Sequence, residues 1–265
     1  MMDFLKEIKK ASNSVLDVLG TGYLEAVYEE ALAHELRLRK IPYERQRNFE
    51  ILYKGYKVGE GRADLILNPL WCSKAGKEIV LELKNAKKIN DSHRRQAQVY
   101  MVSLNIEKGG VLSFGDEVLL EMVERPKREF NRIPVKPIKS KRDLATQLLE
   151  AAKNVYDYFG VEFIYREKGL EIFPNAIGIE LRLNSIDFAS GTYSILYKYH
   201  PVCDCDFDFV FGDRSVANVF SYKKEDDITD ALDELKAYKK SFKLSRCFLV
   251  CIPSKEGDKV QLHEV

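Results

Sequence analysis

The chain has 265 residues, of which 45% are hydrophobic and 31% charged, and its formal net charge is +1. This composition is typical of a globular protein and argues against disorder along the whole chain. No apolar run approaches the roughly 18 residues of a membrane span, and no apolar core of a secretory signal follows the first methionine. Five cysteines in such a chain indicate reduced thiols, so we expect a soluble, intracellular protein without a membrane segment.

Charge is distributed unevenly along the chain. Residues 1–124 contain 19 basic and 19 acidic residues, residues 125–142 contain eight and one, and residues 143–265 contain 15 and 21. The middle segment also holds three of the eight prolines, which favour an extended chain. We therefore predict a domain at 1–124, a basic Pro-rich linker at 125–142 and a second domain at 143–265. The linker could be a plain tether, which is the simpler interpretation, or an arm that contacts phosphates.

The first domain has the pattern of an α/β protein. Apolar residues three and four positions apart predict helices, and short runs of β-branched and aromatic residues between turn residues predict strands. In chain order the predicted elements are helices at 13–19 and 24–38, strands at 49–53, 58–67 and 78–84, a helix that starts near Asp91, and strands at 109–114 and 118–123.

Charged side chains interrupt the apolar strand predicted at 78–84. Because side chains alternate along a strand, Glu82 and Lys84 share one face while Leu81 and Leu83 share the other. Burial of such charges costs several kcal/mol unless they are paired or bind an ion. If the two strands form a hairpin, Asp64 lies beside Glu82. The group is then either an ion-paired pair of strands or a site where two carboxylates hold Mg²⁺ and the lysine stabilises developing negative charge.

The order of these residues resembles the PD-(D/E)XK nuclease superfamily. Asp64 followed by Glu82 and Lys84 matches its core pattern, and residues 22–28, Gly-Tyr-Leu-Glu-Ala-Val-Tyr, match the signature of its GxxExxY-motif family. Residues 96–100 are also similar to the QxxxY element of RecB-type nucleases. The resemblance covers about residues 10–115. Ala63 stands where the family pattern has Pro, and the segment 70–77 looks longer than in the family.

The resemblance implies a restriction-endonuclease-like αβββαβ core with nuclease activity on DNA. The catalytic residues that it implies are Glu25, Asp64, Glu82, Lys84, Gln96 and Tyr100, and the ligands of Mg²⁺ (or Mn²⁺) are Asp64, Glu82 and Glu25. Lys84 would be the catalytic lysine, and Gln96 and Tyr100 would position the site or the substrate strand.

Some of these residues also have a plain structural interpretation. Glu25 near a helix start can simply complement the helix dipole, Gln96 can cap a loop, and Tyr28 and Tyr100 fit a hydrophobic core.

Five basic residues flank the candidate site and could contact phosphates. They are Arg62, Lys87, Lys88, Arg94 and Arg95. As single surface charges, most of them would contribute little.

The second domain repeats part of the first. Residues 195–198 repeat residues 51–54 at an offset of 144, and residues 219–223 match residues 80–84 at an offset of 139. The helix predicted at 144–159 takes the place of the helix with the GxxExxY signature. We therefore predict a duplication into two tandem α/β domains, with similar strand patterns arising independently as the alternative.

These offsets predict a degenerate second copy, a pseudo-nuclease domain. Asp208 would correspond to Asp64, but Ser221 would replace Glu82. Lys223 would persist in the place of Lys84. The copy would lack a clear counterpart of the helix glutamate.

Taken together, the sequence predicts a metal-dependent nuclease that hydrolyses phosphodiester bonds in nucleic acid, with DNA as the expected substrate. The alternative is a catalytically silent nucleic-acid-binding or assembly subunit that retains the nuclease fold. The acidic second domain is expected to serve as a structural or interaction domain, for a homodimer or a protein partner. Its four cysteines fit buried thiols better than a zinc site, because their spacing is not that of zinc-binding knuckles.

Overall fold

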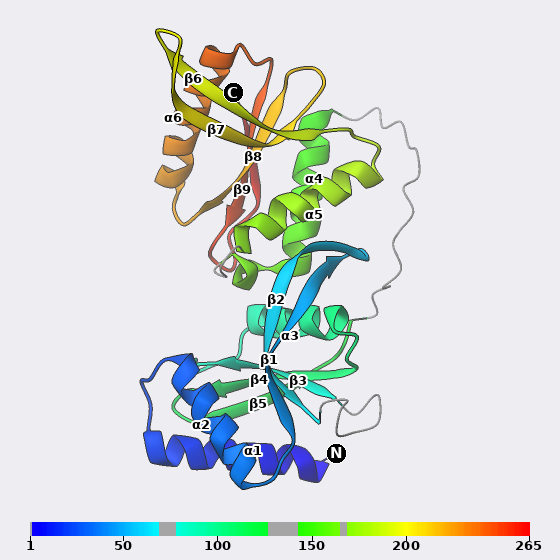
Figure 1. The fold of residues 1–265 in the computed structure, drawn as a ribbon, viewed down its shortest axis with the longest axis vertical. Coiled ribbons are helices and arrows are strands. Elements are labelled where there is room, and N and C mark those ends of the chain that lie inside the picture. The colour runs from blue at the N-terminus through cyan, green and yellow to red at the C-terminus, as the bar shows by residue number, and fades with distance from the viewer. Residues whose placement is uncertain (1, 69–77, 127–142, 165–168) are drawn as a thin grey trace. The chain divides into compact units, whose positions relative to one another are not determined.

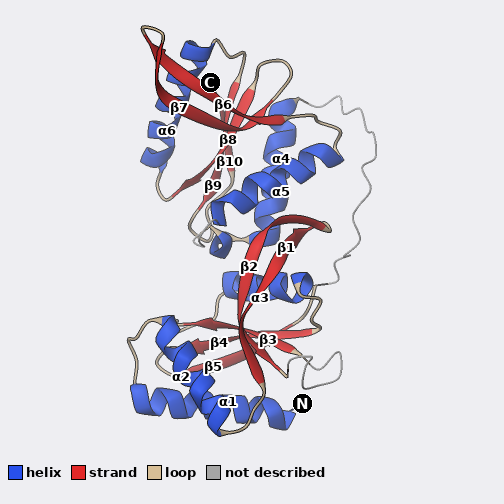
Figure 2. Ribbon diagram, in the orientation of Figure 1, coloured by secondary structure: helices blue, strands red, loops and turns tan. Residues whose placement is uncertain are grey.

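The chain forms two compact units, Met1–Asn131 and Arg132–Val265. The computed structural model describes residues 2–68, 78–126, 143–164 and 169–265. The division between the units falls within the predicted linker, most of which lies outside the described residues, as does the segment 70–77. Each unit is a mixed α/β structure with its own five-stranded sheet packed between helices (Figure 2).

The first unit contains the predicted elements in the predicted order. They are α1 (Met2–Leu19), α2 (Glu25–Leu38), β1 (Tyr43–Tyr53), β2 (Tyr56–Leu67), β3 (Ile79–Lys84), α3 (Asp91–Ser103), β4 (Lys108–Phe114) and β5 (Val118–Val123). The first helix and the first strand start earlier than predicted. Charged residues at these starts, such as Lys9 in the helix and Arg45 in the strand, dilute the apolar pattern on which the prediction rests.

The strands of the first unit lie in the order β1-β2-β3-β4-β5. β3 and β4 are parallel, with α3 as the crossover between them, and the other neighbours are antiparallel. Figure 1 shows α1 and α2 on one face of this sheet and α3 on the other.

An apolar cluster between the sheet and α1 and α2 fixes the position of β3. Leu81 and Leu83 belong to this cluster, together with Ile8 of α1 and Leu32 of α2. A slip of β3 by one residue would turn both leucines out of the core. The same constraint directs Glu82 to the opposite face.

The second unit has its own set of elements. They are α4 (Leu144–Phe159), the short 3₁₀ helix η1 (Val161–Phe163), α5 (Gly169–Leu183), β6 (Ala189–Tyr197), β7 (His200–Val210), β8 (Val216–Tyr222), α6 (Glu225–Phe242), β9 (Cys247–Pro253) and β10 (Gln261–Glu264). Helix α5 was not predicted from the sequence, because Pro174 lies inside this helix and proline usually indicates a helix end.

The two sheets share one topology. The second has the order β6-β7-β8-β9-β10, in which β8 and β9 are parallel and the other neighbours antiparallel. Even an irregularity recurs at an offset of 144, since the register of the first hairpin shifts at Ile51/Leu52 and that of the second at Ile195/Leu196. The structure is therefore consistent with the predicted duplication of an α/β fold.

Residues with positive φ mark equivalent helix ends in the two units. Each of the first two helices of a unit, and the helix before its fourth strand, is followed by such a residue. The pairs are Gly20 and Gly160, Lys40 and Ser185, and Asn105 and Lys243. This correspondence equates α4 with α1 and α5 with α2. The prediction that 144–159 replaces the helix carrying Glu25 is therefore wrong, because that role falls to α5.

None of the helices in the described ranges combines the length and the apolarity that crossing a membrane requires.

Tyr28 connects the core of the first unit to the segment that precedes α2. Its ring is fully buried and stacks on Phe114, with ring centroids 4.8 Å apart. Its hydroxyl donates to the carbonyl of Gly20 at 2.9 Å and accepts from the backbone N–H of Tyr23 at 3.3 Å. One side chain thus holds the turn from which α2 starts.

Replacing Tyr28→Phe should lower the free energy of unfolding of the first unit by about 1 kcal/mol, because two hydrogen bonds of this turn are lost while the ring stays. Urea titration measures the change. Tyr23→Phe is the matched control, since that side chain is 48% exposed, and it should stay within about 0.5 kcal/mol of the wild type. Equal effects of the two variants would contradict the role given to the Tyr28 hydroxyl.

Candidate active site

The strand register brings Asp64 and Glu82 together. In the β2–β3 pair Leu65 faces Leu81 and Ile66 faces Val80, so one step further along the register Asp64 lies opposite Glu82. Beyond the backbone pairs of β2 and β3, a side chain accepts the next hydrogen bond, because the backbone N–H of Leu83 donates to Asp64 Oδ2 at 2.9 Å.

Lys84 supplies the opposite charge from the same strand. Glu82 is only 1% exposed, and the Nζ of Lys84 donates to its Oε1 at 2.7 Å. The same ammonium lies 4.0 Å from Oε2 of Glu25 at the start of α2. The structure therefore brings together Glu25, Asp64, Glu82 and Lys84, from α2, β2 and β3.

The charges of this group shift one another's protonation. Burial raises the pKa of Asp64 well above its usual value, and the negative charge of Glu82 raises it further, against the opposing effects of the Leu83 N–H and Lys84. For Lys84, burial alone would lower the pKa, but the charges of Glu82 and Glu25 outweigh it and the pKa is raised. Lys84 thus keeps its proton, whereas ionisation of Asp64 is disfavoured by burial and by the negative charge of Glu82.

The loop after β3 is attached to the turn before α2. The side-chain amide of Asn85 donates to the carbonyl of Tyr23 at 2.6 Å. Tyr28 holds the same turn from the other side through its hydroxyl. The two contacts together fix the N-terminus of α2, and with it Glu25, beside the end of β3.

Gln96 and Tyr100 form a pair within α3. Both side chains are buried, and Gln96 Nε2 donates to the Tyr100 hydroxyl at 3.1 Å. The Tyr100 ring packs edge-on against Phe49 of β1 at 4.9 Å. Gln96 Oε1 is buried and accepts no hydrogen bond from the described residues. The two side chains lie one helical turn apart, and the pair fixes α3 against the first hairpin.

The five candidate phosphate contacts fall into two groups. Arg94 is held by Glu121, at 2.6 and 3.0 Å, and by Asp91 at 2.7 Å, and Lys87 pairs with Asp116 at 3.1 Å. The guanidinium of Arg94 is therefore already paired with two carboxylates of the protein, and its contact with Glu121 joins α3 to β5. No ion pair within the described part of the chain engages the other three, which are Arg62, Lys88 and Arg95.

A second polar network, which the sequence analysis above does not include, lies beside the group. Glu29 of α2 is 9% exposed and accepts from Arg45 at 2.9 Å and from Gln46 at 3.2 Å. Gln46 has a positive φ of 53° and lies opposite Asp64 in the β1–β2 register. Glu29 and Arg45 carry no signal of their own in the sequence, because each resembles an ordinary surface charge.

The donors suit a divalent cation held by few protein ligands. Asp64 and Glu82 form a coupled carboxylate pair, and Mg²⁺ is commonly held by one or two carboxylates together with water. Among the described residues, no group of three or more His, Cys, Asp or Glu side chains is arranged to hold a metal ion. Glu25 contacts this group through the ammonium of Lys84, at 4.0 Å.

In the second unit the register shows which residues correspond to the candidate site. Phe209 faces Ala217 as Leu65 faces Leu81, and the backbone N–H of Val219 donates to Asp208 Oδ2 at 2.7 Å, as that of Leu83 does to Asp64. The offset for β3 is therefore 136 rather than 139.

With this offset, Asn218 and not Ser221 corresponds to Glu82, and Phe220 and not Lys223 corresponds to Lys84. The sequence prediction was wrong here, because Val, Phe and Tyr match at several offsets in any buried strand. The Asn218 side chain accepts from the backbone N–H of Asp208 at 3.1 Å. Glu25 corresponds to Leu170, so Asp208 is the only carboxylate kept from the group in this copy.

The cysteines of the second unit belong mainly to its core. Cys205, Cys247 and Cys251 are buried in one apolar cluster, and Cys203 is exposed. Burial raises the pKa of the Cys247 thiol to about 11 and that of Cys251 to about 12. All three therefore stay protonated and act as small apolar side chains.

Comparison with known proteins gives one family match. Residues 2–126 match the family described as the PD-(D/E)XK nuclease superfamily. Curated proteins give no match. Among solved structures, the crystal structure of SSO0001 matches 38% of this chain with 22% identity and a TM-score of 0.30, and the match spans half of that protein's length. The first unit is thus similar, over nearly its whole length, to the PD-(D/E)XK nuclease superfamily.

Proposed function

We propose that the first unit is a metal-dependent nuclease of the GxxExxY-motif type that hydrolyses phosphodiester bonds, with DNA as the expected substrate. The observation that carries this proposal is the contact of Lys84 with the buried Glu82, at 2.7 Å, directly opposite Asp64. The match of residues 2–126 to the nuclease superfamily supports it.

In this proposal each charged residue has its own task. Asp64 and Glu82 would hold a divalent cation, Mg²⁺ or Mn²⁺, which when bound would activate water and neutralise charge on the phosphodiester. Lys84, whose raised pKa keeps it protonated, would stabilise the negative charge that develops on the phosphate. Glu25 would orient the Lys84 ammonium from 4.0 Å. Gln96 and Tyr100 would keep α3 in position.

The second unit is proposed to bind or support rather than to cleave. Asn218 and Phe220 stand at the positions that correspond to Glu82 and Lys84. Asp208 therefore has neither a second carboxylate nor an ammonium at these positions. The second candidate function is a catalytically silent nucleic-acid-binding or assembly subunit that forms a homodimer or binds a protein partner. It is favoured by the missing charges at these positions and by the net charge of −6 over residues 143–265.

Lys84→Ala should reduce metal-dependent cleavage by about 100-fold or more, because the positive charge beside the phosphate is lost. The assay uses single- and double-stranded DNA and RNA with Mg²⁺, with Mn²⁺ and with chelator. Lys223→Ala is the matched control and should cleave like the wild type, since Lys223 is exposed and follows β8. If the folded wild type cleaves none of these substrates, the nuclease proposal fails and the silent binding subunit is favoured.

Asp64→Asn should stabilise the metal-free protein increasingly as the pH rises. The raised pKa of Asp64 means that ionisation costs more in the folded than in the unfolded chain. The wild type therefore loses stability as the pH increases from the unfolded pKa through the raised folded pKa, and asparagine cannot ionise. The gain is about 1.4 kcal/mol for each unit by which the pKa is raised.

Urea titration in chelator between about pH 4 and pH 8 measures this gain, across the range where carboxyl groups of this kind titrate. Asp116→Asn is the control, because that carboxylate is 70% exposed, and its stability relative to the wild type should not increase in this way. An advantage of Asp64→Asn that is constant or shrinks with pH would contradict the raised pKa of Asp64.

The basic residues without ion pairs should contribute to the salt dependence of nucleic-acid binding. Replacing Arg62, Lys88 or Arg95 with Ala, each in the Lys84→Ala background, should lower the slope of log K against log salt by about 0.7–0.9, since one phosphate contact is lost. Arg94→Ala should instead lower the free energy of unfolding, because Arg94 joins α3 to Glu121. Unchanged slopes in all three variants would exclude this surface as the phosphate contact.

A further inference from the structure

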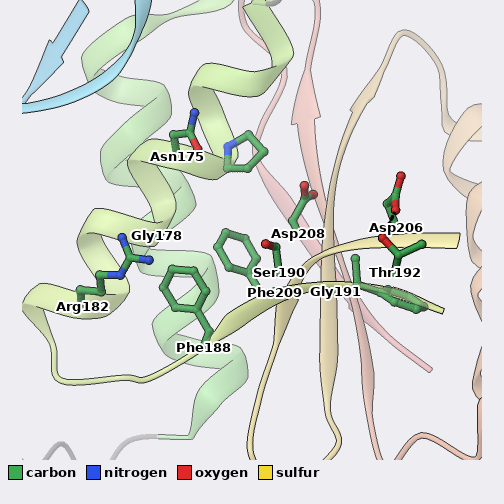
Figure 3. Close-up of a pocket in the computed structure, with 12 residues that line it drawn as sticks. Asn175, Gly178, Arg182, Phe188, Ser190, Gly191, Thr192, Asp206, Asp208 and Phe209 are labelled. Carbon is green, nitrogen blue, oxygen red and sulfur yellow. Dashed lines mark hydrogen bonds between the residues drawn. The ribbon is translucent and has the colours of Figure 1, made fainter.

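A cavity of about 560 Å³ lies within the second unit, between helix α5 and strands β6 and β7. Its volume is within the range of small-molecule sites, roughly 300–1,000 Å³. Asp208, the residue that corresponds to Asp64, lines it. Figure 3 shows Asn175 and Arg182 on α5 facing the strands that carry Ser190 and Asp208. The cavity therefore occupies the position of the candidate active site in the first unit.

The cavity exists because the second unit has small residues where the first has a polar network. In the first unit, Glu29 accepts hydrogen bonds from Arg45 and Gln46 between α2 and β1. At the offsets of 145 for this helix and 144 for this strand, their counterparts are Pro174, Ala189 and Ser190. None of the three can fill the space of the side chain that it replaces, so the space between helix and strand is open.

One part of the cavity wall is aromatic. The rings of Phe188 and Phe209 meet edge-to-face, with centroids 4.9 Å apart. The guanidinium of Arg182 lies over the Phe188 ring, 4.6 Å from its centroid. Stacking uses the face of the guanidinium and leaves its in-plane N–H groups to bind an anion, and no ion pair with a described residue takes them up. This part of the wall suits a flat ring next to a phosphate.

Another part of the wall accepts hydrogen bonds. Asp208 uses Oδ2 for the backbone N–H of Val219, at 2.7 Å. Asp206 uses Oδ1 for the Thr192 hydroxyl, at 2.6 Å. Each carboxylate is therefore held in place through one oxygen, while a carboxylate can accept through both. A ligand in contact with this part of the wall needs hydrogen-bond donors, such as N–H groups.

We propose that the cavity binds a nucleotide whose base carries an exocyclic amino group, either free or within a nucleic-acid strand. The base stacks against Phe188, its amino group donates to Asp208, and its phosphate pairs with Arg182. The choice of a nucleotide among flat ligands rests on the nuclease function proposed above. Flat bases held by aromatic stacking and read through their hydrogen-bonding edges are a general mode of recognition.

Isothermal titration of the full chain in chelator tests the proposal with AMP, CMP, GMP and UMP. The first three should bind, and UMP should bind about tenfold or more weakly than CMP, because it presents a carbonyl where cytosine presents the amino group. A five-residue oligo-dA distinguishes the two sources. Tighter binding than AMP assigns the site to a strand, and equal binding assigns it to the free nucleotide.

Two variants separate the contacts. Asp208→Asn should weaken binding of CMP about tenfold or more, since the acceptor loses its negative charge and one of its two acceptor oxygens, whereas Asp204→Asn, the matched control on the same strand, should not change it. Arg182→Gln should weaken AMP and leave adenosine unaffected. The thermal unfolding midpoint shows whether each variant is folded.

Several results would overturn the proposal. They are no binding of any of the nucleotides by the folded chain, UMP as tight as CMP, no effect of Asp208→Asn, or binding of spermidine in place of the nucleotides. Because titration in chelator does not depend on cleavage, a chain that binds CMP but cleaves nothing contradicts only the nuclease. A chain that cleaves but binds no nucleotide here contradicts only this site.

Discussion

Two carboxylates buried side by side, where β2 and β3 meet, are the constraint on which the first unit depends. Burying such charges costs several kcal/mol unless partners compensate, and the compensation comes from the same strand. Lys84 contacts Glu82 at 2.7 Å, and the backbone N–H of Leu83 donates to Asp64. These contacts require one register of β3, and that register is held by Leu81 and Leu83 in the core on the other face. The register of β3 that buries the two leucines is thus the same register that places the charged side chains.

The second unit has the same sheet topology without this pair of charges. It keeps the strand order, the parallel pair and the hydrogen bond from strand backbone to Asp208. With Asn218 in the place of Glu82, no second carboxylate needs an ammonium, and the lysine position can be occupied by Phe220. Loss of the neighbouring network of large polar side chains leaves a cavity beside Asp208. Aromatic rings and hydrogen-bond acceptors line this cavity.

Much of the first unit follows from its sequence. The alternation in β3 predicted that Glu82 and Lys84 share the face opposite Leu81 and Leu83, whereas the contact between Gln96 and Tyr100 within α3 came from the structure. Prediction was weakest where local sequence is ambiguous. The second copy was aligned three residues out of register along β8, because buried apolar strands match one another at many offsets, and α5 was missed because of Pro174.

The sequence by itself determined which charged side chains share a strand face and in what order the candidate residues follow, because alternation and motif spacing are local properties of the chain. Only the tertiary structure decided which residues meet. The network of Glu29 and Arg45, the assignment of Asn218 to the position of Glu82, and the cavity beside Asp208 depend on helices and strands far apart in the chain. Contacts of this kind are set by strand register and by the volume of facing side chains, and neither is written in any single segment.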